Sequence, residues 1–358
     1  MKPPSHHVNR RDLLRFRRSA SSLHAGDGRF SATKDVASDD LLRASRPAMG
    51  SYFEVRLGAR IPSGSDLAER ALNLIEALEA QLTIYRDDSE VSVLNASAHL
   101  GPVTVEPGLF ALLERAQRLS RETGGAYDVS TGALSEAWGF FRGPKHVPDP
   151  ETLADACDRT GYHHLHLDPA NKTVSFDRPG IVINLGSIGK GYALDRVAGL
   201  IRDHWWPTTA LVHGGRSSLY ALGSPPGRFG GRWQVALRNP FDPDRPLGIL
   251  KLRNRGMGTS GNSFQRFEAD GHVYGHILDP RTGAPAPGPA SVTVLAPTAA
   301  EADALSTAFY LLGPDAASTL VARNPELAAI FVEEGKADRS PRLQTFGLGP
   351  DEFQRDVS

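Results

Sequence analysis

The feature that most constrains the fold is an apolar run that leads through a glycine-rich turn into a helical pattern. The run covers residues 181–185, the segment 186–191 reads Gly-Ser-Ile-Gly-Lys-Gly, and apolar residues then recur at helical spacing as far as Ile201. A short apolar run indicates a buried strand, and glycines allow a tight turn and close approach of the backbone to another group. The sequence therefore predicts a strand, a turn and a helix in this order.

This turn has two possible functions. Backbone N–H groups at the start of a helix attract phosphate oxygens, and Lys190 would add positive charge. The glycine spacing matches neither the dinucleotide-binding fingerprint nor a P-loop. A phosphate site and a plain tight connection are therefore both open at this point.

Length and charge limit the class of protein. The chain has 358 residues, of which 40% are hydrophobic, so it is long enough for one large or two modest domains. Forty basic residues stand against 41 acidic ones, which argues against nucleic acid as a partner. The single cysteine, Cys157, forms no disulfide within the chain and is expected to be a small core residue.

The two ends differ in composition from the rest of the chain. We expect residues 1–43 to form a flexible basic extension, residues 44–340 to form the folded domain, and residues 341–358 to form a polar tail. Arg10 and Arg11 resemble the start of a twin-arginine export signal, but the apolar segment that such a signal needs does not follow. No apolar run is long enough to cross a membrane. We expect a cytoplasmic protein without a transmembrane segment, with export as the alternative.

Periodicity and capping residues predict several helices and strands. Helices are expected at 66–82 with Asp66 as cap, at 107–123, from Thr298 to a stop at Gly313 and Pro314, and at 316–323. Strands are expected at 52–57, 208–212, 218–222, 233–237, 291–295 and 328–333.

The helix after Thr298 carries the clearest candidate for metal binding. Asp303 and Thr307 are four residues apart, so they share one helix face. A carboxylate and a hydroxyl are hard oxygen ligands that suit Mg²⁺ or Ca²⁺. An Asp–Thr hydrogen bond within the helix is the alternative.

Three further segments contain candidate binding or catalytic residues. His276 and Asp279 flank two apolar residues before a Pro-Arg-Thr-Gly turn, which suits acid–base chemistry on an anionic substrate or, alternatively, a turn whose polar groups satisfy one another. Tyr85 follows a helix end and either stacks on a planar ligand or packs on the core. Asp128, in an apolar and aromatic segment, either contributes to a ligand site or caps the next helix.

Taken together, eight segments in order resemble the ApbE family, the FAD:protein FMN transferases. They are 49–51, 85–95, 126–128, 185–195, 213–215, 259–261, 276–283 and 302–307, and the resemblance covers roughly residues 45–335. It implies an α+β fold related to the T-fold, with mixed sheets packed with helices around a central flavin cleft.

The resemblance also implies site residues. Those matched to binding of FAD are Met49, Tyr85, Ala126, Tyr127, Asp128, Gly186, Lys190, Tyr192, Asp195 and Ile277. Asp303, Thr307 and the backbone carbonyl of Gly189 match metal ligands. His276 is the candidate for acid–base assistance, and Asp279 of the same motif is the second catalytic candidate.

The implied reaction uses FAD as substrate and needs Mg²⁺. FMN is transferred to a Thr or Ser of an acceptor flavoprotein, AMP leaves, and the enzyme is a monomer or a homodimer. Two alternatives stay open: a protein that binds FAD without transferring it, and a pyrophosphatase that releases FMN and AMP.

Three residues depart from the family's pattern. Asn184, Arg216 and Asn262 stand where acidic residues are usual. These three residues would alter a second metal position or the recognition of the acceptor. Whether they leave activity intact, reduce it or abolish it is open.

Overall fold

The structure is a computed structural model that describes residues 40–205, 209–227, 230–261, 266–335 and 340–355. All of these lie within one compact unit, Ala32–Ser358. Arg10, Arg11 and Asn262, which the sequence singled out, lie outside the described residues.

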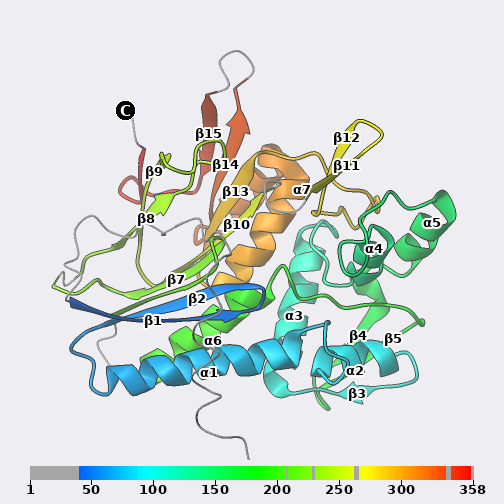
Figure 1. Cartoon of the computed structure of the whole chain (residues 1–358), viewed down its shortest axis with the longest axis horizontal. Coiled ribbons are helices and arrows are strands. Elements are labelled where there is room, and N and C mark those ends of the chain that lie inside the picture. The colour runs from blue at the N-terminus through cyan, green and yellow to red at the C-terminus, as the bar shows by residue number, and fades with distance from the viewer. Residues whose placement is uncertain (1–39, 206–208, 228–229, 262–265, 336–339, 356–358) are drawn as a thin grey trace, which may run out of the picture. The chain divides into compact units, whose positions relative to one another are not determined.

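The largest element is an eight-stranded antiparallel sheet (Figure 1). Its strands, in spatial order, are β1 (Leu41–Ala48), β2 (Ser51–Gly58), β6 (Thr209–Gly214), β7 (Ser218–Gly223), β10 (Arg255–Gly261), β13 (Ser291–Ala296), β14 (Ala328–Glu334) and β15 (Pro341–Phe346). Three smaller antiparallel sheets are formed by β8 (Trp233–Leu237), β9 (Gly248–Leu252) and β16 (Phe353–Arg355), by β3 (Val103–Thr104), β5 (Thr173–Phe176) and β4 (Leu165–Asp168), and by β11 (Arg266–Ala269) and β12 (His272–Gly275).

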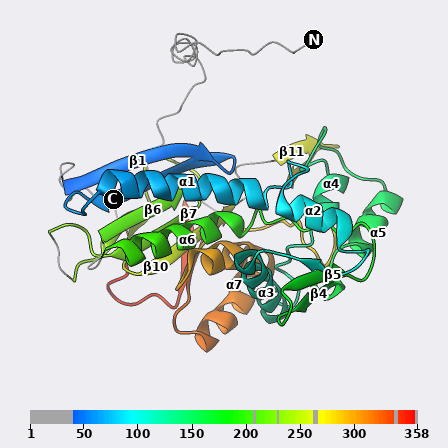
Figure 2. The same ribbon diagram turned by 90° about the horizontal axis from the view of Figure 1, so that it is seen from below.

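The helices fall into two groups. The helices α1 (Gly64–Leu82), α6 (Gly189–His204) and α7 (Ala299–Arg323) pack on the large sheet, and α6 contacts both α1 and α7 (Figure 2). The segment between α1 and α6 holds α2 (Glu90–Ser97), α3 (Pro107–Glu122), α4 (Gly132–Ala137) and α5 (Pro150–Asp158).

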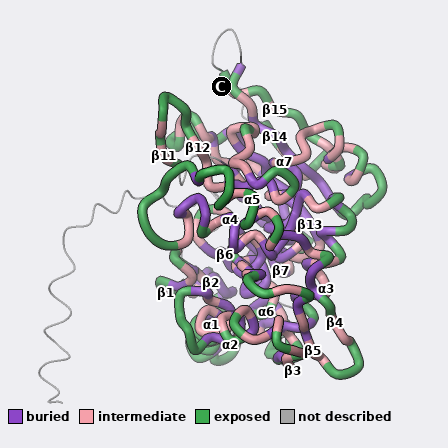
Figure 3. The backbone as a smooth tube through the Cα atoms, turned by 90° about the vertical axis from the view of Figure 1, so that its right-hand side faces the viewer, coloured by how far each residue is buried: buried purple, intermediate pink, exposed green. Residues whose placement is uncertain are grey.

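The core forms where α1 and the large sheet meet. Phe53, Val55 and Leu57 alternate along β2 and are fully buried, as strand periodicity requires. Leu67 and Ile75 of α1 are buried in the same cluster. Figure 3 shows buried residues along the inner strands, whereas the hairpin of β11 and β12 is largely exposed.

Most of the expected helices and strands are present, and the differences have local causes. Helix α1 begins after Ser63, so Asp66 lies in its first turn and is not its cap. Thr298 caps α7 as expected, and the helix breaks at Gly313, whose φ of 78° is not helical, before a second segment that begins with Pro314.

Residues 181–185 do not form the expected strand. Val182 makes only an isolated bridge to Thr131, and the backbone of Ile183 pairs with the side chain of Asn95 through hydrogen bonds of 2.8 and 3.0 Å. Ile181, Ile183 and Leu185 are buried. The backbone of Ile183 is satisfied by a side chain, whereas Val182 and Asn184 bond to the backbone of Gly132 and Val129.

Both expected boundaries of the domain differ from the structure. Strand β1 begins at Leu41, inside the expected extension, and the expected polar tail contains β15 and β16. Strand β15 lies at the edge of the large sheet, and β16 pairs with β9. Edge strands expose many of their side chains, so their polar composition resembles that of a tail.

Candidate functional site

A cavity of about 830 Å³ lies where the large sheet, the start of α6, the middle of α7 and the segment between α1 and α6 meet. Twelve of the residues proposed from the sequence line it: Met49, Tyr85, Ala126, Tyr127, Asp128, Gly186, Gly189, Lys190, His276, Ile277, Asp303 and Thr307. Tyr192, Asp195 and Asp279 are not among the lining residues.

Close packing between α7 and β10 places Asp303 and Thr307 at the cavity. A Cβ atom on Gly258 of β10 would lie 2.4 Å from the backbone of Ala302, so only glycine permits this approach. The hydroxyl oxygen of Ser260, farther along β10, lies 3.0 Å from that of Thr307 and 2.8 Å from that of Ser306. The strand therefore both positions the helix and contacts its polar side chains.

Asp303 is a buried carboxylate with a shifted pKa. The backbone N–H of Gly191 donates to its Oδ2 at 2.7 Å. Burial raises the pKa of Asp303 to about 7, although the charge of Lys190 and hydrogen bonds from Ser218 and Gly191 act in the opposite direction. A carboxylate in this position gains from a nearby cation when it is ionised.

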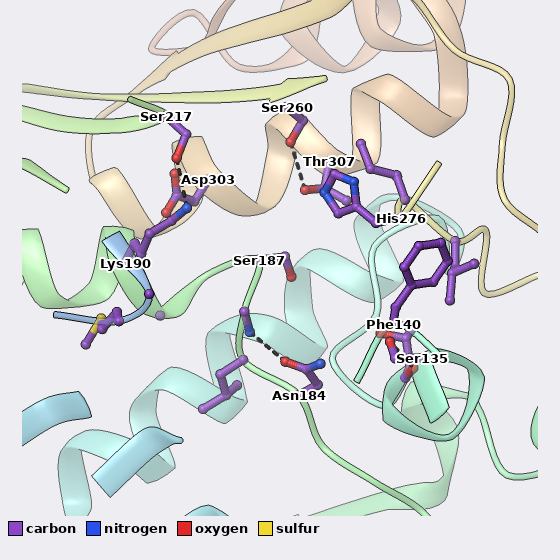
Figure 4. A pocket seen from close by; sticks show the side chains of 18 of the residues that line it. Ser135, Phe140, Asn184, Ser187, Lys190, Ser217, Ser260, His276, Asp303 and Thr307 are labelled. Atoms are coloured by element: carbon purple, nitrogen blue, oxygen red, sulfur yellow. Dashed lines mark hydrogen bonds between the residues drawn. The ribbon is translucent and has the colours of Figure 1, made fainter. Parts of the chain in front are cut away.

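Lys190 lies beside Asp303 at one end of the cavity (Figure 4). Its ammonium group donates to the hydroxyl of Ser217 at 2.8 Å. Positive and negative charge are thus placed together on the cavity wall, where both would face a bound group.

The glycine-rich turn differs from the expected phosphate cradle. Several of its N–H groups already donate within the protein: Gly186 to Asn184 Oδ1, Ile188 and Gly189 to the carbonyl of Leu185, and Gly191 to Asp303. These four donors are engaged in holding the turn and Asp303. The turn therefore contributes to the site mainly by placing Gly189 and Lys190 on the cavity wall.

The other end of the cavity is aromatic. Tyr85 is 65% exposed, and its ring centroid lies 5.1 Å from that of Phe141. Both rings line the cavity, as do Phe140 and the buried Tyr127. Because Tyr85 is exposed, core packing does not account for its position, and its ring is available to a planar ligand.

Met49 lies in the turn between β1 and β2 on the cavity wall. Met49 and Gly50 both have positive φ, 50° and 63°, as a two-residue type I′ hairpin turn requires. The N–H of Met49 donates to Glu79 Oε1 at 2.7 Å, which holds this turn against α1.

Asp128 also lines the cavity, but its hydrogen bonds are structural. It accepts from the N–H and hydroxyl of Ser130 at 2.8 and 2.7 Å and from the N–H of Tyr162 at 2.6 Å. It does not cap α4, whose N-terminal cap is Thr131. Burial raises the pKa of Asp128, while the hydrogen bonds act to lower it.

The segment after β12 contains two catalytic candidates, His276 and Asp279, and only His276 lines the cavity. His276 and Ile277 line the cavity, and Figure 4 shows the imidazole on the same side as Thr307. Asp279 instead pairs with Arg281, accepting from Nη2 at 2.7 Å and from Nε at 2.9 Å. Burial alone would raise the pKa of Asp279, but the hydrogen bonds and charge of Arg281 outweigh it and lower the pKa. Asp279 is thus a turn-stabilising carboxylate, which supports the structural alternative for this residue.

Tyr192 and Asp195 do not line the cavity, and both make hydrogen bonds within the protein. The hydroxyl of Tyr192 accepts from Arg196 Nη1 at 2.6 Å, near the start of α3. Asp195 accepts hydrogen bonds from the backbone of α7.

Two of the three unusual positions lie on the cavity. Asn184 and Arg216 are lining residues, one neutral and one basic. The sequence did not single out Ser217, Ser260 or Phe141, although Ser260 belongs to one of the segments that carry the family resemblance.

The donor atoms available for a metal are few. In the described part of the chain, no group of three or more His, Cys, Asp and Glu side chains is placed to hold a metal ion. Asp303 and Thr307, with the backbone at Gly189, offer a carboxylate, a hydroxyl and a carbonyl, all hard oxygen donors. Mg²⁺ is commonly held by few protein ligands and completes its shell with water and phosphate oxygens, so this set fits it.

Comparisons with known proteins identify the family. The chain matches the model of the ApbE family over residues 49–331. It is 33% identical over 307 residues to an FAD:protein FMN transferase of Treponema pallidum (strain Nichols), with 82% of this chain and 84% of the relative covered. A second FAD:protein FMN transferase, of Salmonella typhimurium (strain LT2), is 31% identical over 311 residues, with 83% and 87% covered.

Solved structures also resemble this chain. An apbe protein from Thermotoga maritima superposes with a TM-score of 0.77 at 28% identity, covering 86% of this chain and 97% of that one. Flavin transferase ApbE from Vibrio cholerae gives a TM-score of 0.75 at 27% identity, with the same coverage. These neighbours confirm the expected α+β class. Among the helices that the structure describes, none combines the length and apolarity needed to span a bilayer.

Proposed function

The chain belongs to the ApbE family, and from this premise we propose that it is an FAD:protein FMN transferase that modifies a Thr or Ser of an acceptor flavoprotein. The observation that carries the proposal is the cavity, which combines an aromatic end at Tyr85 with a charged end at Lys190 and Asp303. FAD has the same two parts, a planar ring system and a pyrophosphate.

In the proposed reaction, the acceptor hydroxyl oxygen attacks the phosphorus of the FMN half of FAD. The bond between this phosphorus and the bridging oxygen breaks, AMP leaves with that oxygen, and the hydroxyl proton passes to a base. His276, on the cavity wall, is the proposed base. Transfer of this kind depends mainly on alignment and on neutralising charge.

Asp303, Thr307 and the carbonyl of Gly189 are the proposed ligands of Mg²⁺, which when bound would neutralise charge on the pyrophosphate. Lys190 would contribute a second positive charge at the same end of the cavity. Tyr85 and Phe141 would cover the flavin ring. Asn184 and Arg216 line the same cavity as these proposed ligands and contacts.

The test combines purified protein, FAD, Mg²⁺ and an acceptor domain that carries a flavinylation Thr. In-gel flavin fluorescence after denaturing electrophoresis reports covalent transfer. A fluorescent acceptor band that requires Mg²⁺, is lost in Asp303→Ala and persists in the matched control Asp315→Ala is the expected result. Asp315 lies on α7 beyond the break at Gly313 and is exposed.

Other outcomes would support the alternatives. Free FMN and AMP without a labelled acceptor would indicate a pyrophosphatase, and intact bound FAD would indicate a flavin-binding protein. We also propose a cytoplasmic location and a monomer or homodimer, which cell fractionation and light scattering test directly. Recovery in an exported fraction would instead support the alternative based on Arg10 and Arg11.

A further inference from the structure

Helix α7 is attached to α6 at its N-terminus by a side chain from α6. The carboxylate of Asp195 accepts from the N–H of Ala299 at 2.7 Å and from that of Ala300 at 3.0 Å. The first N–H groups of a helix have no partner within the helix, so a carboxylate from elsewhere can cap them. Thr298, the helix's own cap, accepts from the N–H of Glu301.

A second attachment lies one helical turn away on both helices. Gly191, four residues before Asp195, donates its N–H to Asp303, four residues after Ala299. Residues four apart share one face of a helix, so both attachments lie on the same contact between α6 and α7. A Cβ atom on Gly191 would lie 2.2 Å from the carbonyl oxygen of Ala299, so the backbones meet directly.

Two attachments a turn apart determine both the position of α7 along α6 and its rotation. The start of α6 carries Gly189 and Lys190, and α7 carries Asp303 and Thr307. Strand β10 holds α7 on another side, through the close approaches at Gly256 and Gly258, and the two attachments set where α7 meets α6. The spacing between the cavity-lining groups of the two helices therefore depends on both contacts.

We infer that Asp195 is a positioning residue that acts through α7, holding Asp303 and Thr307 at the distance from Gly189 that a shared divalent cation requires. This role deepens the proposed function, on which it rests, and it replaces direct contact with FAD for this residue. Arg115 Nη1, 3.9 Å from Asp195 Oδ2, lies on the side of the carboxylate that faces α3.

The test compares Asp195→Ala and Asp195→Asn with Thr298→Ala as matched control. Thr298→Ala removes a cap at the same end of α7 but leaves the attachment to α6 intact. Asp195→Asn keeps one acceptor oxygen, so it serves as the conservative variant and as the reserve where the alanine variant does not fold. Mn²⁺ binding, measured by electron paramagnetic resonance without FAD or acceptor, reports the cation site independently of transfer. FAD affinity is measured by flavin fluorescence without metal.

We expect Asp195→Ala to weaken Mn²⁺ binding by about 10- to 100-fold, the range typical of residues that orient metal ligands, and to leave FAD affinity within about twofold. Asp195→Asn should recover part of the loss, and Thr298→Ala should lower the melting temperature without changing Mn²⁺ affinity. Unchanged Mn²⁺ binding in Asp195→Ala, an equal loss in Thr298→Ala, or a loss of FAD affinity instead would each overturn the inference.

The binding measurement also separates this inference from the proposed function. A wild-type protein that binds Mn²⁺ but transfers no FMN would contradict the transferase proposal. The Mn²⁺ affinities of the variants would still support or overturn the role of Asp195. A wild-type protein that binds no divalent cation would overturn the inference itself.

Discussion

The hydroxyl oxygens of Ser260 and Thr307 lie 3.0 Å apart. Each hydroxyl has one proton to donate, and this determines which of the two is the donor. Ser306 donates to the carbonyl of Asp303 at 2.8 Å, so its single proton is engaged and its oxygen accepts from Ser260. Ser260 has no second proton, and Thr307 must therefore donate to it. With its proton directed at β10, the hydroxyl of Thr307 keeps lone pairs available to a cation.

Removing Ser260 should therefore impair the cation site without affecting the flavin end. We expect Ser260→Ala to raise the Mg²⁺ concentration for half-maximal transfer by about tenfold or more, because Thr307 loses the partner that orients it. FAD affinity should change little. Ser318→Ala is the matched control, since its hydroxyl on α7 contacts only the helix backbone. An unchanged Mg²⁺ requirement in Ser260→Ala would contradict this role.

The raised pKa of Asp303 predicts how stability changes with pH. An aspartate in an unfolded chain has a pKa near 3.9, whereas burial raises the pKa of Asp303 to about 7 in the folded protein. The folded state therefore holds this proton more tightly, and the stabilisation that it confers below pH 4 is lost as pH rises to 7. Asp303→Asn has no acidic proton to lose at this position, so its stability does not fall with pH for this reason. Without divalent cations, the unfolding free energy of the variant relative to wild type should rise by up to about 4 kcal/mol across this window.

Urea unfolding at several pH values measures this difference. Asp195 also titrates in this window, since burial raises its pKa to about 6. Its charge raises the pKa of Asp303, so the two titrations are coupled and the comparison measures their combined effect. Mg²⁺ should stabilise the wild type at pH 8 and not the variant. A stability difference that is constant between pH 4 and 8 would show that Asp303 is not buried as an acid with a raised pKa.

Lys190 should control the pH at which Asp303 becomes ionised. Its charge is one of the influences that lower the pKa of Asp303 against the larger effect of burial. Lys190→Gln should therefore shift the acidic limb of kcat/KM for transfer to higher pH, because a more alkaline medium is then needed to ionise Asp303. Lys251→Gln, on β9, is the control. Superimposable pH profiles for Lys190→Gln and wild type would contradict the link.

Local sequence signals predicted the elements and the site residues that depend on near neighbours. The cap at Thr298, the break at Gly313 and the shared face of Asp303 and Thr307 all follow from spacings of a few residues. The role of Asp195 could not be predicted in this way, because its partner Ala299 is 104 residues away. The residue type suited both a ligand contact and a helix cap, and only the packing of α6 against α7 distinguishes them.

Two other differences between the predicted and the observed elements depend on the hydrogen-bond partners of the backbone. Residues 181–185 have the composition of a strand, but their backbone partners are the side chain of Asn95 and the backbone of residues 129–132, which are distant in sequence. Strand β15 alternates partly buried and exposed residues at a sheet edge, so its sequence resembles a polar tail. In both cases the deciding contact is with a segment that local pattern does not reveal.

Tyr85 is an exposed aromatic residue on the cavity wall, and its replacement should affect the binding of FAD much more than folding. The residue is 65% exposed, so Tyr85→Ala removes little packing and should leave the melting temperature nearly unchanged. Aromatic stacking contributes about 1 kcal/mol, so FAD affinity should fall about fivefold, measured by quenching of flavin fluorescence. Tyr85→Phe keeps the ring and should retain wild-type affinity. Tyr52 is 56% exposed and is not a lining residue of the cavity, so Tyr52→Ala is the matched control and should bind FAD normally. Equal affinities for Tyr85→Ala and Tyr52→Ala would place the flavin ring away from Tyr85 and would remove the aromatic end from the proposed FAD site.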